Sequence, residues 1–274
     1  MDKKSGIMII FMILHIQTNS VARGESDEAV HVLQIKHIKI ENYSGPINAD
    51  VMRLFENVEI MESINSNYSP SRNNFFFALP NLKKIHLYES TVEIKINDDI
   101  SQCCKNLNEM IFVRNGADRK TWQAIGREWP LKTLCLIEES VPSFETDLIN
   151  NIHLENLTIY HSGIQMIDNT AFEKIFQLKY LYLQKNEIKS ITKEILAPLE
   201  YLKVLDLEGN QLEKLTTDQF PFLPNLEKLN VANNPIKEIN LEGIKEKAPM
   251  LSEVDISGIE GIDVPEISGI KFIT

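Results

Sequence analysis

A repeat of about 24 residues is the feature that most constrains this chain. From residue 178 to residue 226, two successive blocks each begin with the pattern L-x-x-L-x-L-x-x-N-x-L. A fixed period in the twenties with this pattern predicts a repeat architecture. The first leucine of the pattern recurs eight times, at Leu82, Leu107, Leu131, Leu154, Leu178, Leu202, Leu226 and Leu251.

The spacing inside each block predicts how one repeat folds. The leucines at the fourth and sixth positions alternate with mostly polar residues, which indicates a short strand with one buried face. One repeat cannot bury its own apolar face, so stacked repeats share a continuous core. We expect Phe172, Leu196 and Phe220 to fill that core from the returning half of the repeat. The predicted fold class is α/β: a curved solenoid with a parallel β-sheet on its concave face and short helical or irregular segments on its convex face.

Asparagines recur where the chain leaves each strand. Asn186, Asn210 and Asn234 occupy this place in the best repeats. They predict a polar ladder that satisfies backbone groups at the bend. Asn115 lies at the same place further back, but Ser90, Glu139 and Ser162 replace the asparagine in three blocks. We therefore expect the ladder to be broken towards the N-terminal half.

The ends of the chain differ from the repeats. Lys3 and Lys4, the apolar run 7–14 and the small residues at 20–22 predict that residues 1–22 are a secretory signal peptide. The run is too short to span a membrane, which takes about 20 apolar residues. We expect residues 23–54 to form an N-terminal cap with degenerate strands, residues 55–262 the solenoid, and residues 263–274 a C-terminal capping tail. The alternative for the tail is an exposed apolar end that docks another chain.

Repeat signals weaken upstream of residue 82. Ile35, Ile38 and Ile40 predict an early strand. Phe55, Val58 and Ile60 are interpreted as the opening of a longer repeat, and the polar residues 63–74 as an exposed insertion loop.

Composition limits the classes of partner. The chain carries a formal net charge of −11, which argues against nucleic acid or an anionic membrane as the main partner. Three N-x-S/T triplets predict glycosylation at Asn42, Asn67 and Asn156 and agree with a secreted, extracellular protein.

The chain has three cysteines, an odd number for a secreted protein. We expect Cys103 to be buried in the place that Leu199 and Leu223 hold elsewhere, Cys104 to face outward, and Cys135 to lie on the concave face. Two interpretations stay open: an intermolecular disulfide through Cys104 or Cys135 that links a dimer, or free or mixed-disulfide thiols.

The repeat register predicts a protein-binding surface on the concave face. Tyrosines and β-branched residues gather at its centre, next to an acidic end, and such residues give large contact areas at low entropic cost. The alternative is that strand propensity alone placed them there. A glycan at Asn156 would screen part of this surface. The candidate contact residues are Ile111, Val113, Ile137, Tyr160, Tyr180, Tyr182, Val204, Asp206 and Glu208.

Catalytic signals are weak. The chain contains no G-x-S-x-G, Gly-rich phosphate loop or H-E-x-x-H motif. His86 and His161 are both expected on the concave face, but three repeats apart, roughly 14 Å by strand spacing, too far to share a metal. His37 has no cysteine or carboxylate at ligand spacing and is interpreted as a surface residue. The sequence predicts no enzyme, no cofactor and no metal.

The repeats resemble the leucine-rich repeat family, over about residues 55–262. The signal peptide, the repeat spacing and the weak N-terminal repeats are similar to the mosquito leucine-rich immune proteins, in a short type without the coiled coil. This resemblance implies a role in innate immunity, with binding of complement-like or microbial ligands through the concave face. The alternative function is an extracellular adhesion, developmental or structural interaction protein without an immune role.

Overall fold

The computed structural model describes residues 35–45, 47, 52, 55–68, 79–92, 104–263 and 266–274. The chain forms two compact units, Met1–Ala117 and Asp118–Thr274, called here the first and second units. The predicted signal peptide, residues 1–22, lies outside the described residues. That residues 55–262 act as one solenoid domain stays a prediction.

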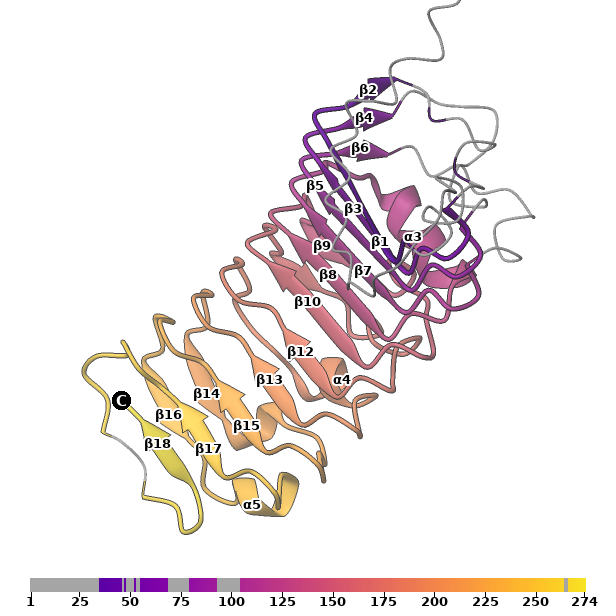
Figure 1. Ribbon diagram of the computed structural model, residues 1–274. Coiled ribbons are helices and arrows are strands. Elements are labelled where there is room, and N and C mark those ends of the chain that lie inside the picture. Colours follow the sequence, from indigo (N-terminus) through magenta and orange to yellow (C-terminus); the bar gives the residue numbers. More distant parts are fainter. Residues whose placement is uncertain are drawn as a thin grey trace, which may run out of the picture. The chain divides into compact units, whose positions relative to one another are not determined.

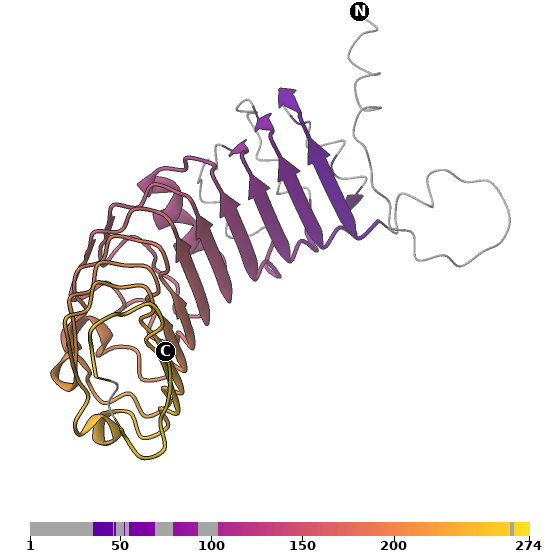
Figure 2. The same cartoon turned by 90° about the vertical axis from the view of Figure 1, so that its left-hand side faces the viewer.

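The first unit is built on a parallel sheet (Figure 2). Each strand aligns with the strand one repeat later, so that Ile38 lies beside Met61 and Met61 beside Ile85. Three strands of two residues follow the longer ones and pair with one another in the same way. The longer strands are β1 (His37–Glu41), β3 (Ile60–Ile64), β5 (Lys84–Tyr88) and β7 (Glu109–Val113), and the short ones are β2 (Ser44–Gly45), β4 (Asn67–Tyr68) and β6 (Thr91–Val92).

The second unit repeats this plan, and Figure 1 shows its strands side by side. All pairs in the sheet are parallel, with Leu157 beside Leu181 and Leu181 beside Leu205. Parallel strands of this kind need a crossover connection, which the rest of each repeat supplies. The strands are β8 (Thr133–Ile137), β10 (Asn156–Tyr160), β12 (Tyr180–Tyr182), β13 (Val204–Asp206), β15 (Lys228–Asn230), β17 (Glu253–Asp255) and β18 (Lys271–Ile273).

Alternating burial confirms the predicted strand pattern. In β8, Leu134 and Leu136 are buried while their neighbours keep part of their exposure. Each fully buried leucine contributes about 1.5 to 3 kcal/mol relative to an exposed one. Repetition of this pattern from β1 to β17 produces the stacked-coil parallel solenoid that the sequence predicts.

The returning half of each repeat in the second unit is short and irregular, as predicted. The longest described helix, α3 (Arg119–Glu128), is capped by Asp118, whose carboxylate accepts a hydrogen bond from the Thr121 amide at 2.9 Å. Trp122 and Ile125 of this helix are buried, and the predicted interior positions Phe172, Leu196 and Phe220 are also buried. The other elements are β9 (Ser143–Phe144), β11 (Met166–Ile167), α4 (Lys193–Leu196), β14 (Lys214–Thr216), η5 (Thr217–Gln219), β16 (Glu238–Asn240) and α5 (Ile244–Lys247).

The upstream register is partly correct. Ile38 and Ile40 are buried in β1, which confirms the early strand. The assignment of Phe55, Val58 and Ile60 to the three core positions is wrong by three residues. Val58, Met61 and Ser63 hold these positions, because they lie 24 residues before Leu82, Ile85 and Leu87.

The predicted insertion loop at 63–74 is wrong for its first six residues. Ser63 is fully buried at the end of β3, and Tyr68 is buried in β4. The polar sequence is tolerated because the side chains satisfy each other: the Ser63 hydroxyl hydrogen-bonds Tyr68 Oη at 2.6 Å and Ser90 Oγ at 2.9 Å. Residues 69–74 lie outside the described residues.

The polar ladder is present, and Ser90 and Ser162, predicted to break it, extend it by accepting the amides of Ser66 and Glu139. Asn186 Oδ1 accepts the amide of Ser162 at 3.0 Å, as predicted for the asparagines. In the first unit the amide of Ser66 donates to Ser90 Oγ at 3.1 Å, and the amide of Ser90 donates to Asn115 Oδ1 at 2.8 Å. Serine hydroxyls replace the asparagine oxygen because both accept an N–H at similar reach.

A left-handed residue precedes each ladder position. Gly209 has φ 66°, and Lys185 and His161, at the same place in other repeats, have φ 54° and 49°. Non-glycine side chains pay a steric cost there. The leucine pattern does not predict this left-handed turn residue. His161, predicted on the concave face, is therefore an exposed turn residue outside the strand.

Two further predictions concern the cysteines and the tail. The expectation that Cys104 faces outward is wrong: it is 1% exposed, three residues before Leu107, as Leu199 is before Leu202. A disulfide to another chain through its buried sulfur would need the backbone to move. Cys135 lies half-buried on β8, and Cys103 is outside the described residues. The tail adds β18 to the sheet beside β17.

Candidate protein-binding surface

The face of each sheet opposite the buried leucines is called here its open face. It corresponds to the predicted concave face. On the second unit, Tyr180 lies beside Val204 and Tyr182 beside Asp206 in register, and Ile137 lies beside Tyr160. All six side chains are half-buried. The structure therefore brings these six candidates and Glu208 onto one face, while Ile111 and Val113 lie on β7 in the first unit.

Tyr160 is held by a lysine. Lys185 Nζ lies 5.2 Å from the centroid of the Tyr160 ring, a cation–π contact worth about 0.5 to 1 kcal/mol at an exposed site. A hydrogen bond to Tyr160, and then the tyrosine's charge, raise the pKa of Lys185. The lysine thus favours one orientation of the Tyr160 ring at the edge of the open face.

Asp206 is the most constrained carboxylate on this face. Its Oδ1 accepts the amide of Glu208 at 3.0 Å, and its Oδ2 accepts Gln184 Nε2 at 3.0 Å. Burial raises the pKa of Asp206, and these hydrogen bonds only partly offset the effect. Burial, and then the charge of Asp206, raise the pKa of the Tyr182 phenol.

The turn that Asp206 holds recurs in two other repeats. Asn230 Oδ1 accepts the amide of Ala232 at 3.0 Å, and Asp255 Oδ1 accepts the amide of Ser257 at 2.9 Å. An aspartate or asparagine oxygen commonly accepts the amide two residues on. The acidic end of the surface therefore has a structural role that the predicted register missed. The signal for it is the recurrence of Asp or Asn at one repeat position.

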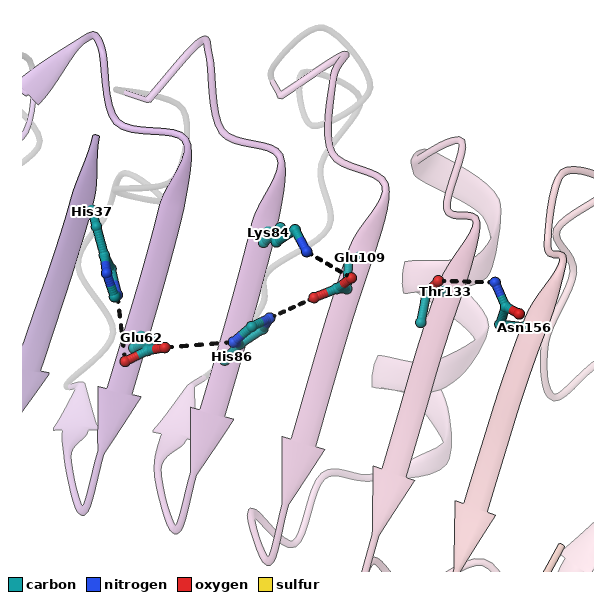
Figure 3. A network of polar contacts seen from close by, with 7 residues as sticks. All are labelled: His37, Glu62, Lys84, His86, Glu109, Thr133 and Asn156. Atoms are coloured by element: carbon teal, nitrogen blue, oxygen red, sulfur yellow. Dashed lines mark hydrogen bonds and ion pairs between the residues drawn. The ribbon is translucent and has the colours of Figure 1, made fainter. Parts of the chain in front are cut away.

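The first unit carries a chain of alternating histidines and glutamates on its open face (Figure 3). His37 Nε2 lies 3.4 Å from Glu62 Oε2, and His86 Nδ1 lies 3.7 Å from Glu62 Oε1. His86 Nε2 lies 2.8 Å from Glu109 Oε1, and Lys84 Nζ lies 3.0 Å from Glu109 Oε2. Burial raises the pKa of Glu109, but hydrogen bonds from His86 and Lys84 outweigh it and hold the pKa below its ordinary value.

This network corrects the interpretation of His37 as a surface residue without a carboxylate nearby, and it gives His86 two carboxylate neighbours. Each has a carboxylate beside it, contributed by the next repeat. A search for carboxylates within the same strand could not find these neighbours, whereas a search one repeat further along the chain could. In the described part of the chain, no group of three or more His, Cys, Asp or Glu side chains is placed to hold a metal ion. Nor is any described helix long and apolar enough to cross a membrane.

The three predicted glycosylation sites have different surroundings. Asn156 lies on the open face, beside Tyr180, and its Nδ2 donates to Thr133 Oγ1 at 3.2 Å (Figure 3). Asn42 is exposed at a turn and accepts a hydrogen bond from Asn65 Nδ2 at 2.7 Å. Asn67 is exposed on β4. Occupancy of all three stays a prediction.

Comparisons with known proteins agree with this geometry. The family model described as Leucine rich repeat matches residues 152–212 and 200–246, so the chain contains leucine-rich repeats. No curated protein sequence matches the chain. Among solved structures, a leucine-rich repeat protein of Leptospira interrogans matches with a TM-score of 0.62 and 20% identity, covering 89% of this chain and 67% of that one.

A second similar solved structure comes from an immune protein. It is the leucine-rich repeat domain of APL1, a mosquito immune protein, with a TM-score of 0.54 and 17% identity. The match covers 89% of this chain and 73% of that one. At these identities the likeness shows the fold, and it confirms the predicted class: a leucine-rich repeat solenoid, a fold that typically serves as a scaffold for protein interactions.

The raised pKa of Asp206 leads to a pH prediction. Because the folded-state pKa is raised, the unfolded chain loses this proton first, and stability falls as the pH rises through that range. The variant Asp206→Asn keeps an amide oxygen for the turn, as Asn230 does, without the charge. Since solvent still reaches the carboxylate, we expect D206N to raise Tm by about 1 to 2 °C at pH 7, with no gain near pH 3, in thermal scans by circular dichroism.

Asp168 is the matched control for this measurement. Its pKa is lowered, by hydrogen bonds from the Thr170 amide and hydroxyl. The variant Asp168→Asn should therefore lose stability at pH 7, the opposite sign. Equal shifts of Tm in D206N and D168N at pH 7 would contradict the explanation.

Proposed function

We propose that this chain is a secreted, non-enzymatic recognition protein of innate immunity whose second unit binds a protein partner through its open face. The observation that carries the proposal is the cluster of Tyr160, Tyr180, Tyr182 and Val204 on adjacent strands. These side chains are half-buried, whereas the leucines between them are fully buried. Tyrosines on a rigid sheet give a large contact area for little loss of side-chain entropy.

The repeats support a binding role over a catalytic one. Leucine-rich repeats span the strands that carry the tyrosines. Two nearby carboxylates, those of Asp206 and Asp255, hold turns and so already have a structural explanation. Support for the immune context comes from the structural likeness to APL1. Complement-like proteins or microbial surface molecules are the ligands we propose for this context.

A double variant tests the surface. Peptides are selected from a phage-displayed random library on the full chain, and the affinities of the enriched peptides are then measured. We expect Tyr180→Ala with Tyr182→Ala to weaken binding at least ~30-fold, about 2 kcal/mol, because both are central contacts. Tyr201→Ala is the matched control, since Tyr201 is 52% exposed in a loop before β13. A loss of affinity in the control alone, or in neither variant, would count against the open face as the binding surface.

Secretion and the immune role need separate tests. N-terminal sequencing of protein from the culture medium should find a start at Arg23, and retention inside the cell would refute the signal peptide. For the immune role, the chain is added to body fluid taken before and after bacterial challenge. Enrichment of complement-like partners after challenge, lost in the Tyr180→Ala/Tyr182→Ala variant, favours the immune role. Absence of that enrichment favours the alternative role in adhesion or structure.

A further inference from the structure

Three carboxylates on the open face of the second unit lack a cationic partner within the described part of the chain. Among the described residues, no lysine, arginine or histidine nitrogen lies within 4.0 Å of the carboxylates of Asp206, Glu208 or Asp255. Acidic residues close by are paired: Lys228 Nζ lies 2.9 Å from Glu253 Oε1, and Lys179 Nζ lies 2.8 Å from Glu155 Oε2. Negative charge that is not neutralised therefore gathers on one part of this face.

These carboxylates adjoin the tyrosine cluster. In the sheet register, Asp206 lies beside Tyr182, and Val204 lies beside Tyr180 on the same two strands. Asp255 lies beside Asn230, which lies beside Asp206. At about 4.8 Å per strand, the two aspartates are about 10 Å apart. A contiguous surface thus changes from aromatic to acidic over a few strands.

Two lysines near these carboxylates are already engaged. Lys185, which follows β12, lies over the ring of Tyr160, and the charge of Glu208 contributes to its raised pKa. Lys228 on β15 is held by Glu253. Asn233 Nδ2, a neutral donor, is the hydrogen-bond partner of Glu208 Oε1 at 3.2 Å. The described side chains around these carboxylates therefore form no ion pair with them within 4.0 Å.

We propose that the open face of the second unit binds a basic and apolar segment of a protein partner, with an arginine or lysine between Asp206 and Asp255 and an apolar side chain on Tyr180 and Tyr182. The inference rests on the proposed function and names the chemistry of its partner. Burial already disfavours the charge of Asp206, and a cation placed beside it would offset that cost. The net charge of −11 also favours encounter with a basic partner.

The repeats supply matched variants for the test. Asn230 holds the same turn as Asp206 and Asp255 with a neutral amide. Asp206→Asn with Asp255→Asn therefore removes two charges and retains both turns. The reverse change, Asn230→Asp, adds a charge between them. The peptides selected from the random displayed library on the full chain serve as probes, and circular dichroism confirms that each variant is folded.

We expect the enriched peptides to carry lysine or arginine next to an aliphatic or aromatic residue. Their binding should weaken at least ~10-fold in the D206N/D255N variant, strengthen in N230D, and fall with rising salt. Peptides that lose affinity in the tyrosine double variant, but carry no basic residue and ignore D206N/D255N, would overturn this inference and leave the proposed function standing. Peptides indifferent to both variants, or no enrichment at all, would overturn both.

Discussion

Replacing Phe172 with alanine is expected to cost about 3 to 5 kcal/mol of the free energy of unfolding, as large aromatic deletions in a core do. Phe172 is 1% exposed, and its ring centroid lies 5.3 Å from that of Phe144, which is also buried. Removing it deletes the aromatic pair and leaves a cavity between two successive repeats. Because each repeat packs only on its neighbours, no distant element can fill the gap.

The measurement is denaturation of the full chain by heat and by urea, followed by circular dichroism. A loss of this size lowers Tm by about 6 to 20 °C in a unit of this length. Phe222→Ala is the matched control, since Phe222 is 60% exposed and its loss should stay within about 0.5 kcal/mol. Similar losses in F172A and F222A would show that Phe172 is not a core residue in solution.

The sequence predicts the strands well because the core repeats a strict pattern. Leucines at fixed spacing identify which residues of β5, β7, β8 and the later strands are buried, and every such position is confirmed. The prediction fails where the core residue is not apolar. Ser63 is buried in the place of a leucine, and its partner hydroxyl belongs to Ser90, one repeat away. Hydrophobic periodicity cannot reveal a position that polar groups satisfy mutually.

The candidate surface was predicted less completely than the fold. Register alone placed Tyr180, Tyr182 and Val204 side by side, which the structure confirms. It could not show that Asp206 is held by the amide of Glu208, or that His86 lies between two glutamates, because both depend on side-chain direction. Comparing each residue with the one a repeat later would have suggested both.

Replacing Asn210 with alanine tests the ladder that joins these repeats. Asn210 is 5% exposed, accepts the amide of Ile188 at 3.1 Å, and donates to the carbonyls of Leu183 and Leu207, at 2.9 Å each. Alanine leaves the buried Ile188 amide without this acceptor, at about 1 to 3 kcal/mol. It also removes one of the two asparagine donors of each carbonyl, since Asn186 and Asn234 still donate to Leu183 and Leu207. We therefore expect a loss of about 3 kcal/mol.

Two further variants distinguish the effect of breaking the ladder from the effect of removing any asparagine. Asn225→Ala removes an exposed amide that donates to a single carbonyl, that of Glu200 at 2.8 Å, and should cost under about 1 kcal/mol. Asn210→Ser should fall between the two. Ser162, at the same repeat position, accepts an amide of the preceding repeat, that of Glu139, but one hydroxyl cannot donate to both carbonyls. Urea denaturation ranks the three variants. If N210A cost no more than N225A, the buried amide would not be what holds neighbouring repeats together.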